Sequence, residues 1–308
     1  MTVDICIPVY KPDDKLKRLI SGLSTQTVKP RNIIIMYTMN NDHLSEEFLL
    51  PAQQICNVKV IELKPEEFDH GGTRKQAMAE SSADVVIMMT MDAIPANDFL
   101  IEQLLSCFLE DKVAAAYARQ LPDKNSSLAE CFTREFNYPK ESCIKSCKDM
   151  DTLGIKTFFC SNVCAAYRNS TYRELGGFVE KTIFNEDMIF SRKIIDGGYK
   201  IYYCAEAMVI HTHNYSAMMQ FHRNFDLAVS QAMFSDVFDG ISSESEGFKY
   251  VKKASKYFID NGKAYLIIPF VYNCGWKYLG YKLGKKYKSL PMGIIKACAM
   301  NKRFFEGK

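Results

Sequence analysis

The chain has 308 residues, and nearly half of them are apolar, which allows one large globular domain or two ordinary ones and excludes a disordered protein. Its net charge of +3 is divided unevenly. Residues 261–308 carry ten basic residues and one acidic residue, whereas residues 1–260 carry a net charge of −6. We therefore expect the basic C-terminal tail to have a binding partner of its own.

Apolar runs alternate with segments of helical periodicity through the first 121 residues. This alternation predicts an α/β fold, with a mostly parallel sheet and helices on both faces. Ligands of such sheets bind at the carboxyl ends of the strands. The predicted strands are 3–9, 32–37, 58–63, 84–89 and 113–118, and helices are predicted around 16–23, near 73–81 and from 98.

The pattern is less regular after residue 121. Helices are predicted at 126–138, 186–196 and 215–238, and strands at 158–167, 199–204 and 208–211. From Gly247 onward the chain reads as helical, basic and aromatic. We place an α/β domain at residues 1–240 and a helical, basic region at residues 241–308.

The eleven cysteines form no recognisable metal-binding or redox motif. No two are separated by two residues, and neither Cys143/Cys147 nor Cys160/Cys164 has a histidine in register. Reduced thiols are therefore expected rather than disulfides. Neither a signal peptide nor an apolar run of 18 residues is present, so we expect a cytoplasmic protein without a membrane span.

Asp92 lies in the segment Thr90–Pro95, directly after the fourth predicted strand. A carboxylate at that position can bind a divalent cation that bridges a diphosphate. Such a cation stabilises the negative charge of a departing nucleotide. Taken alone, the segment is equally well explained as a turn with Asp92 as a polar turn residue.

The segment Asp69–Arg74 places two glycines at the predicted start of a helix. Gly71 and Gly72 allow backbone N–H groups to approach an anion, and Arg74 can pair with phosphate. A tight turn followed by a surface arginine explains the same residues.

Asn185 precedes two acids, Glu186 and Asp187, at the start of another predicted helix, and Arg192 follows five residues after Asp187. We expect Asp187 to stay ionised at neutral pH and to accept a proton from a sugar hydroxyl as a general base. Simple capping of the helix dipole is the alternative interpretation.

His211 and His213 follow a predicted strand, and their spacing puts both on one side of an extended segment. A metal-binding role is compatible with this pattern, although an isolated pair of this kind is more often structural.

The tail from Tyr265 to Phe305 interleaves aromatic and basic residues and has no acid between Lys263 and Arg303. Such helices suit an anionic membrane surface, which we prefer to nucleic acid or to plain solvent as the partner. An apolar stripe faces the membrane in this interpretation, or else it packs on the catalytic domain or on a second subunit of a homodimer. The stripe consists of Trp276, Leu279, Leu283, Tyr287 and Leu290.

Taken together and in order, these segments resemble the family-2 glycosyltransferases of GT-A fold, and within them the bacterial rhamnosyltransferases. The similar strings cover nearly the whole chain. They are Ile7-Pro8-Val9-Tyr10, His70-Gly71-Gly72-Thr73-Arg74, Asp92-Ala93-Ile94-Pro95, Ser161-Asn162-Val163-Cys164, Asn185-Glu186-Asp187, His211-Thr212-His213-Asn214-Tyr215 and Leu279-Gly280-Tyr281-Lys282-Leu283-Gly284.

The resemblance implies an inverting transfer of a sugar from a nucleotide to a hydroxyl group. Asp187 matches the catalytic base, and Asp92 and His211 match ligands of a divalent cation, Mn²⁺ or Mg²⁺. The residues implied in nucleotide-sugar binding are Pro8, Tyr10, His70, Gly71, Gly72, Arg74, Asp92, Glu186 and Arg192.

The donor implied by the resemblance is dTDP-rhamnose, and the acceptor is a saccharide on a polyprenyl diphosphate at the inner face of the cell membrane. Three positions depart from the family pattern. Thr90 replaces the first aspartate of the D-x-D motif, Lys75 replaces an asparagine, and the segment after the second strand, Tyr37–Asn40, lacks the aspartate that many relatives use on the base.

Two other classes of protein stay open at this point. A nucleotidylyltransferase also has an α/β nucleotide fold, but its glycine-rich loop follows the first strand, where this chain has Pro8–Pro12. A non-catalytic module that binds polysaccharide or lipid is the second alternative.

Overall fold

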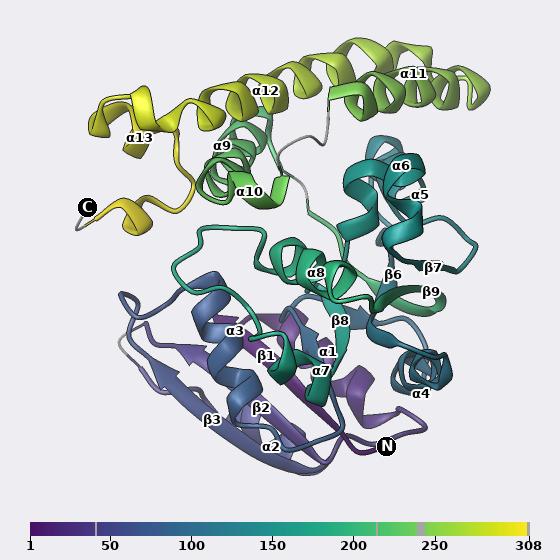
Figure 1. Ribbon diagram of the computed structural model, residues 1–308, viewed down its shortest axis with the longest axis vertical. Helices are drawn as coiled ribbons and strands as arrows, with labels where there is room; N and C mark the ends of the chain where they lie inside the picture. The colour runs from purple at the N-terminus through teal and green to yellow at the C-terminus, as the bar shows by residue number, and fades with distance from the viewer. Residues whose placement is uncertain (41, 214, 239–243, 307–308) are drawn as a thin grey trace. The chain divides into compact units, whose positions relative to one another are not determined.

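The computed structural model describes residues 1–40, 42–213, 215–238 and 244–306 (Figure 1). Asn214 of the predicted motif and the last two residues of the tail lie outside the described residues. The chain forms two compact units. The first, which we call the sheet unit, consists of Met1–Asp123, Tyr138–Lys181 and Glu186–His211; the second, the helical unit, consists of Lys124–Asn137, Thr182–Asn185 and Thr212–Lys308.

The sheet unit contains a nine-stranded sheet within the described residues. Its strands are β1 (Val3–Tyr10), β2 (Asn32–Thr38), β3 (Asn57–Leu63), β4 (Val85–Met89), β5 (Ile94–Pro95), β6 (Val113–Leu121), β7 (Cys143–Lys145), β8 (Cys164–Arg168) and β9 (Lys200–Ile210). Its helices are α1 (Asp14–Ser24), α2 (Glu46–Gln53), α3 (His70–Ala79), α4 (Leu100–Ser106), α6 (Met150–Leu153), α7 (Asn169–Glu174) and α8 (Glu186–Asp196).

The sheet is parallel in its first half and mixed in its second. The strand order is β3-β2-β1-β4-β8-β6-β9-β5, with β7 paired to β9. The pairs from β3 to β4 are parallel, as the alternation of strands and helices predicted. β8 is antiparallel to both β4 and β6, and β9 is parallel to β6 but antiparallel to β5 and β7. The α/β fold is confirmed, but the expectation of a mostly parallel sheet is correct only up to β4.

Helices cover both faces of the sheet because the side chains of its strands alternate. Ile5 and Ile7 of β1 belong to the main core cluster together with Leu19 of α1 and Leu100 of α4. Cys6 points to the other face, where its thiol donates to a backbone carbonyl of α3, and Figure 1 shows α3 running across the sheet. Strands buried on both faces explain the continuous apolar runs in the sequence.

Three of the predicted strands differ in the structure. Residues 154–158 form a 3₁₀ helix, so the strand predicted at 158–167 is reduced to β8. The two short strands predicted at 199–204 and 208–211 form one strand, β9, with an irregularity in its pairing to β6. All eleven cysteines are free thiols, as expected.

The helical unit holds α5 (Leu128–Asn137), α9 (Ala217–Met233), α10 (Ser235–Phe238), α11 (Glu244–Asp260), α12 (Ile267–Lys285) and α13 (Met292–Cys298). The helix predicted at 215–238 is therefore divided into α9 and α10. Phe132, Phe258 and Phe270 form one buried cluster of this unit. Phe225 and Ile295 anchor another.

The chain changes unit at residue 212, whereas the sequence analysis placed the boundary after residue 240. Residues 217–233 belong with the tail because α12 approaches α9 very closely. A Cβ atom added at Gly280 would overlap the carbonyl oxygen of Phe221, and one at Gly284 would overlap that of Phe225. Small residues four apart on a helix allow such an approach of two backbones.

The same packing corrects the interpretation of the apolar stripe in the tail. Leu283, Tyr287 and Leu290 pack against the cluster around Phe225 inside the helical unit. Three of the five stripe residues are therefore partly buried inside the helical unit, and of the other two Leu279 is exposed.

Candidate active site

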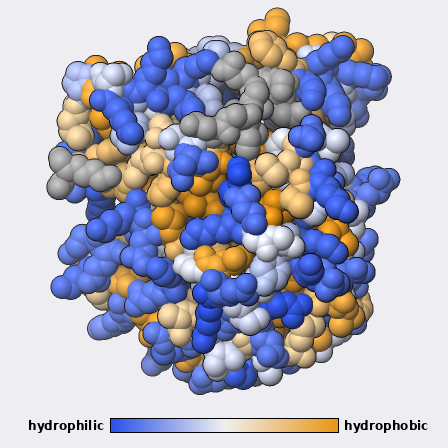
Figure 2. All heavy atoms as spheres, in the orientation of Figure 1, coloured by the Kyte–Doolittle hydropathy of each residue, from blue (hydrophilic) through white to orange (hydrophobic). Residues whose placement is uncertain are grey.

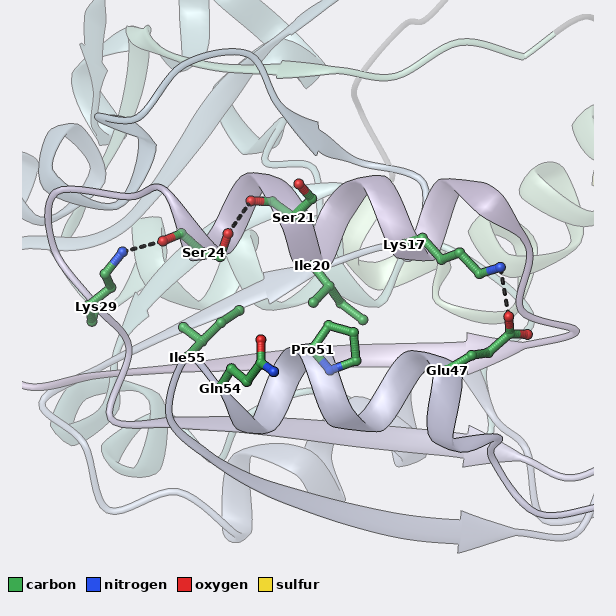
Figure 3. A pocket seen from close by; sticks show the side chains of 9 residues that line it. All are labelled: Lys17, Ile20, Ser21, Ser24, Lys29, Glu47, Pro51, Gln54 and Ile55. Atoms are coloured by element: carbon green, nitrogen blue, oxygen red, sulfur yellow. Dashed lines mark hydrogen bonds and ion pairs between the residues drawn. The ribbon is translucent and has the colours of Figure 1, made fainter.

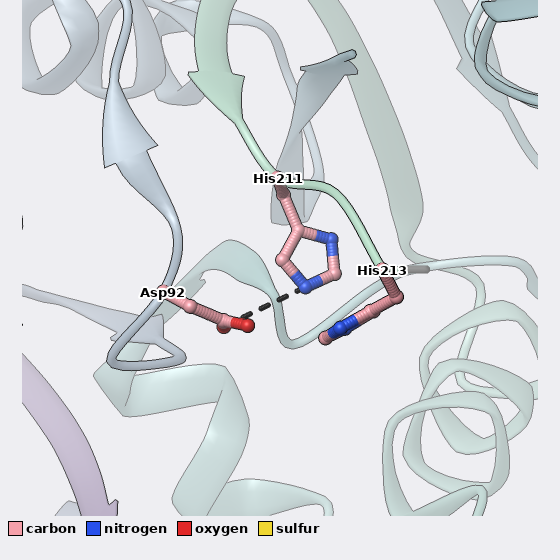
Figure 4. A group of neighbouring side chains, drawn as sticks. All are labelled: Asp92, His211 and His213. Atoms are coloured by element: carbon pink, nitrogen blue, oxygen red, sulfur yellow. Dashed lines mark ion pairs between the residues drawn. The ribbon is translucent and has the colours of Figure 1, made fainter. Parts of the chain in front are cut away.

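Asp92 and His211 follow two strands of the sheet unit, β4 and β9. Asp92 lies in a turn that is closed by a hydrogen bond of 3.0 Å from the N–H of Ala93 to the carbonyl of Thr90. The side chains of Asp92 and His211 point toward one another, with 3.6 Å between His211 Nε2 and Asp92 Oδ1 (Figure 4). This distance is too long for a hydrogen bond. Figure 4 also draws His213, which follows His211 by two residues in the sequence.

Gln120 of β6 orients the His211 ring from the other side. His211 Nδ1 lies 2.9 Å from Gln120 Oε1, while Gln120 Nε2 donates to the hydroxyls of Tyr138 and Ser161 at 2.5 and 3.1 Å. Because Oε1 is only an acceptor, Nδ1 has to carry the proton. In the neutral ring, Nε2 is then the atom that can ligate a metal, and it faces Asp92, which is the arrangement found around metal-bound histidines.

The chemistry of these side chains fits a divalent cation. The ligand atoms of Asp92 and His211 lie within 4.8 Å of one another, and a carboxylate with an imidazole suits Mn²⁺ well and Mg²⁺ through the carboxylate. Thr90 Oγ1 is buried and has no hydrogen-bond partner among the described residues. Lys15 Nζ of α1 lies 4.0 Å from Asp92 Oδ2 and adds a positive charge to this site.

Glu186 and Asp187 begin α8, and their environments push their proton affinities apart. Glu186 is buried, which alone would raise its pKa, but the charge of Arg74 and the amide of Asn162 hold that pKa below its ordinary value. For Asp187, burial and the charge of Glu186 raise the pKa to about 7. Removal from water outweighs the helix dipole, so Asp187 binds its proton more tightly than the expectation of a fully ionised carboxylate assumed.

Asn162 contacts both acids, and no role was predicted for it from the sequence. Its backbone N–H donates to Asp187 Oδ2 at 3.2 Å, and its side-chain amide donates to Glu186 Oε1 at 3.1 Å. The buried hydroxyl of Tyr167 donates to Asn162 Oδ1 at 2.8 Å, which fixes the orientation of the amide. The only signal in the sequence was the string Ser161–Cys164.

Arg74 is buried and lies beside Glu186. Its guanidinium nitrogen Nη1 is 3.2 Å from Glu186 Oε1 and donates to the carbonyl of His70 at 2.9 Å. Arg74 Nε is buried without a hydrogen-bond partner among the described residues. The structure thus joins two segments that the sequence analysis treated separately, and Arg74 is a partner of an acid before any phosphate is bound.

Gly71 and Gly72 lie in the first turn of α3, as predicted, but the N–H of Gly72 already donates a hydrogen bond within the protein. The carboxylate of Asp69 accepts from Gly72 N–H at 2.9 Å and from Lys181 N–H at 2.6 Å. A Cβ atom at Gly72 would lie 2.6 Å from that carboxylate, so the cap itself requires glycine here. Gly71 is buried in the first turn of α3.

The other residues predicted to bind the nucleotide sugar have contacts that do not indicate a particular ligand. Tyr10, at the carboxyl end of β1, is exposed beside the partly buried Pro8. His70 makes an edge-to-face contact with Phe68. Arg192 Nε pairs with Asp196 at 2.7 Å, and its guanidinium lies over the ring of Phe158. Their roles in nucleotide-sugar binding stay predictions.

A hollow of about 510 Å³ lies between α1 and α2, with Ile20 and Pro51 on its walls and the ion pair of Lys17 and Glu47 at one end (Figure 3). None of the predicted site residues lines it. We therefore do not place the donor there.

The fold, with acids after β4 and at the start of α8, defines a glycosyltransferase of the GT-A class. The chain belongs to the family described as "Glycosyltransferase like family 2", whose model matches residues 2–233. That match ends close to the predicted domain boundary. It favours a glycosyltransferase over the nucleotidylyltransferase and over the binding module.

Two relatives match almost the entire chain. It is 36% identical to "O-antigen chain rhamnosyltransferase RfbN" of Salmonella typhimurium, over 99% of this chain and 96% of the relative. It is 38% identical to "O-antigen chain rhamnosyltransferase WbaN" of Salmonella anatum, over 98% and 95%. The resemblance to rhamnosyltransferases expected from the motifs is confirmed.

Solved structures support the fold. A mannosyltransferase from Pyrobaculum calidifontis, in complex with GDP-Man and Mn²⁺, superposes with a TM-score of 0.60, covering 93% of this chain and 86% of that one. S. aureus TarS (residues 1–349) gives a TM-score of 0.55, with coverage of 94% and 92%. Sequence identity is 12% and 14%, so these likenesses concern the fold alone.

Proposed function

We propose that this enzyme transfers rhamnose from dTDP-rhamnose, with inversion, to a hydroxyl of a saccharide carried on a polyprenyl diphosphate. The observation that carries the mechanism is the pair of acids at the start of α8, in which Asp187 has a pKa near 7 beside the ionised Glu186. A general base is most effective when its pKa lies near the working pH. Two acids with divergent pKa values mark an acid–base assignment.

In the proposed reaction the acceptor hydroxyl oxygen attacks the anomeric carbon of the donor. Asp187 takes the hydroxyl proton, and the bond from the anomeric carbon to the diphosphate oxygen breaks, with its electron pair leaving on the diphosphate. One displacement inverts the configuration, and no bond forms between enzyme and sugar. Glu186 stays ionised through Arg74 and Asn162 and keeps the proton affinity of Asp187 high.

Asp92 and His211 would hold the divalent cation, Mn²⁺ or Mg²⁺, with Gln120 fixing the histidine ring. A bound cation supplies positive charge against the departing diphosphate. Lys15, near Asp92, contributes to the same field.

The proposed donor sugar rests on the two relatives, both named as O-antigen chain rhamnosyltransferases. We test it by incubating the protein with dTDP-rhamnose, UDP-glucose or GDP-mannose, each with Mn²⁺ or Mg²⁺, and measuring release of the nucleoside diphosphate. We expect release from dTDP-rhamnose at least tenfold faster than from the other two. Equal release from all three, or release from another donor only, would contradict the proposed donor.

We also propose that the enzyme binds the inner face of the cell membrane peripherally. No helix in the described part of the chain is long and apolar enough to cross a bilayer. Tyr265, Ile268, Tyr272 and Leu279 recur at helical spacing and are exposed, Ile268 to 79%. Figure 2 shows apolar side chains among hydrophilic ones along the edge where α11 and α12 run.

Exposed lysines accompany this stripe, among them Lys263, Lys285 and Lys286. Each contributes about 1 kcal/mol near an anionic surface. We expect the protein to sediment with anionic but not neutral vesicles, and less as salt rises. Ile268→Ser combined with Tyr272→Ser should reduce binding, and Leu50→Ser, an exposed residue of α2, should not. Equal binding to both vesicle types, or none, would instead favour an interface between two copies of the chain.

A further inference from the structure

The helical unit contains a hollow of its own, of about 390 Å³. α5, the segment before α9, and helices α9, α11 and α12 all contribute to its lining. Lys277, Asn273, Gln220, Glu130, Tyr250 and Tyr215 are among the lining residues. His213 and Tyr215, from the family-like string that begins at His211, line this pocket, but none of the residues assigned above to catalysis or donor binding does.

The pocket holds a positive charge, Lys277, that forms no ion pair with any described residue. Glu130 is paired with Arg134, which approaches it at 2.7 and 2.8 Å through two nitrogens. Lys277 has no ion pair and donates no hydrogen bond to any described residue; its ammonium lies 5.8 Å from the centre of the Tyr250 ring. Burial lowers the pKa of Lys277. An anionic ligand would restore the lost solvation of this ammonium.

Two amide side chains line the same pocket. Those of Asn273 and Gln220 make no hydrogen bond to the described residues, and neither is fully buried. Each therefore offers two donors and an acceptor to a ligand. The ring of Tyr215, held by stacking on His213 at 4.7 Å between centres, and the ring of Tyr250 supply apolar faces. Apolar faces with a few placed polar groups are typical of small-molecule pockets.

We propose that this pocket binds a sugar that carries a phosphate at its anomeric carbon. Lys277 pairs with the phosphate, the amides of Asn273 and Gln220 bind sugar hydroxyls, and Tyr250 or Tyr215 covers a face of the ring. A saccharide linked to a lipid diphosphate has these groups, so the pocket is an acceptor subsite. This identification of the occupant rests on the proposed function, whereas binding of a sugar phosphate does not.

We titrate the full-length protein with glucose 1-phosphate, galactose 1-phosphate, inorganic phosphate and dTDP, and measure binding by calorimetry. We expect saturable binding of at least one hexose 1-phosphate. It should weaken about tenfold or more in Lys277→Gln, since one charge-assisted contact is lost. Lys252→Gln, an exposed lysine of α11 outside the pocket, is the matched control.

Asn273→Ala should weaken hexose 1-phosphate binding more than inorganic phosphate binding, and it covers the case in which Lys277→Gln does not fold. Binding that is unchanged in both folded variants, or no binding by the wild type, would overturn the proposal. So would tighter binding of dTDP that depends on Lys277, since the pocket would then hold the donor.

Turnover separates the two sources of the sugar phosphate. With a farnesyl diphosphate-linked saccharide as acceptor, Lys277→Gln should raise the acceptor KM and leave the donor KM unchanged. An unchanged acceptor KM would remove the acceptor-subsite assignment. If the wild type binds hexose 1-phosphate but transfers no sugar, the proposed function fails while the pocket stands.

Discussion

The sheet unit contains two charged sites, the Glu186–Asp187 pair and the Asp92–His211 pair, which differ in how their side chains are contacted. Glu186 and Asp187 lie in a network of direct contacts, with Arg74 3.2 Å from one acid and the backbone of Asn162 3.2 Å from the other. Asp92 and His211 face one another across 3.6 Å without a hydrogen bond. The contacts around Glu186 and Asp187 set the proton affinity of these acids before any substrate binds. Asp92 and His211 are separated, so their proposed role begins when a cation binds between them.

The largest effect is expected at the proton-accepting centre. Asp187→Asn should reduce transfer roughly 10²–10⁴-fold, because a positioned general base is lost, and should leave donor affinity largely intact. Steady-state kinetics with a donor-binding assay check both. Asp196→Asn, on the same helix, should retain activity. Transfer at the wild-type rate by Asp187→Asn would remove it from the base role and turn attention to Glu186.

At the cation centre, Asp92→Ala should weaken donor binding and metal dependence together. Removal of a group that only orients a metal ligand lowers metal affinity roughly 10–100-fold. Because Asp92 is proposed as a ligand itself, we expect its loss to lower metal affinity by more than this. Titration with donor in the presence of Mn²⁺ and then EDTA measures both effects. If the variant keeps its affinity and its response to EDTA, Asp92 is a turn residue. A wild type indifferent to EDTA would mean that Thr90 marks a metal-independent enzyme.

Substitution of Gln120 tests whether the hydrogen bond from His211 to Gln120 orients the imidazole for metal binding. Gln120→Leu removes the acceptor that holds the proton on His211 Nδ1, so the affinity for Mn²⁺ should fall about 10–100-fold. The affinity is measured by calorimetry or by the Mn²⁺ dependence of turnover. The pH dependence governed by Asp187 should not move. An unchanged Mn²⁺ affinity would show that His211 is not a ligand.

The smallest effect is a shift in pH dependence. Transfer requires Asp187 deprotonated, so kcat/KM should fall about tenfold per unit as pH drops below about 7. Glu186→Gln removes the neighbouring negative charge, which lowers the pKa of Asp187 and should move this limb by about one unit or more toward acid. An unchanged or more alkaline limb would show that Glu186 does not set the proton affinity of Asp187.

Much of the sheet unit could be predicted from the sequence. Strands β1, β2 and β4 are buried on both faces and therefore read as apolar runs. Helix α1 was recognised by its helical spacing and α3 by its two glycines. Asp92 and Asp187 were identified because they stand at the end of a strand and at the start of a helix. The second half of the sheet was harder to predict, because the direction of β8 depends on its pairing with β4 rather than on its own residues.

The sequence by itself determined the family and the α/β order of elements, and it singled out the acids proposed for the chemistry, since these depend on local patterns. Only the tertiary structure decided their chemical states. Asn162 reaches Asp187 across 25 positions and Gln120 reaches His211 across 91. Leu283 and Tyr287 became partly buried inside the helical unit through the approach of α12 to α9. Burial and long-range hydrogen bonds set the pKa near 7, because the removal of water depends on which distant residues close around a group.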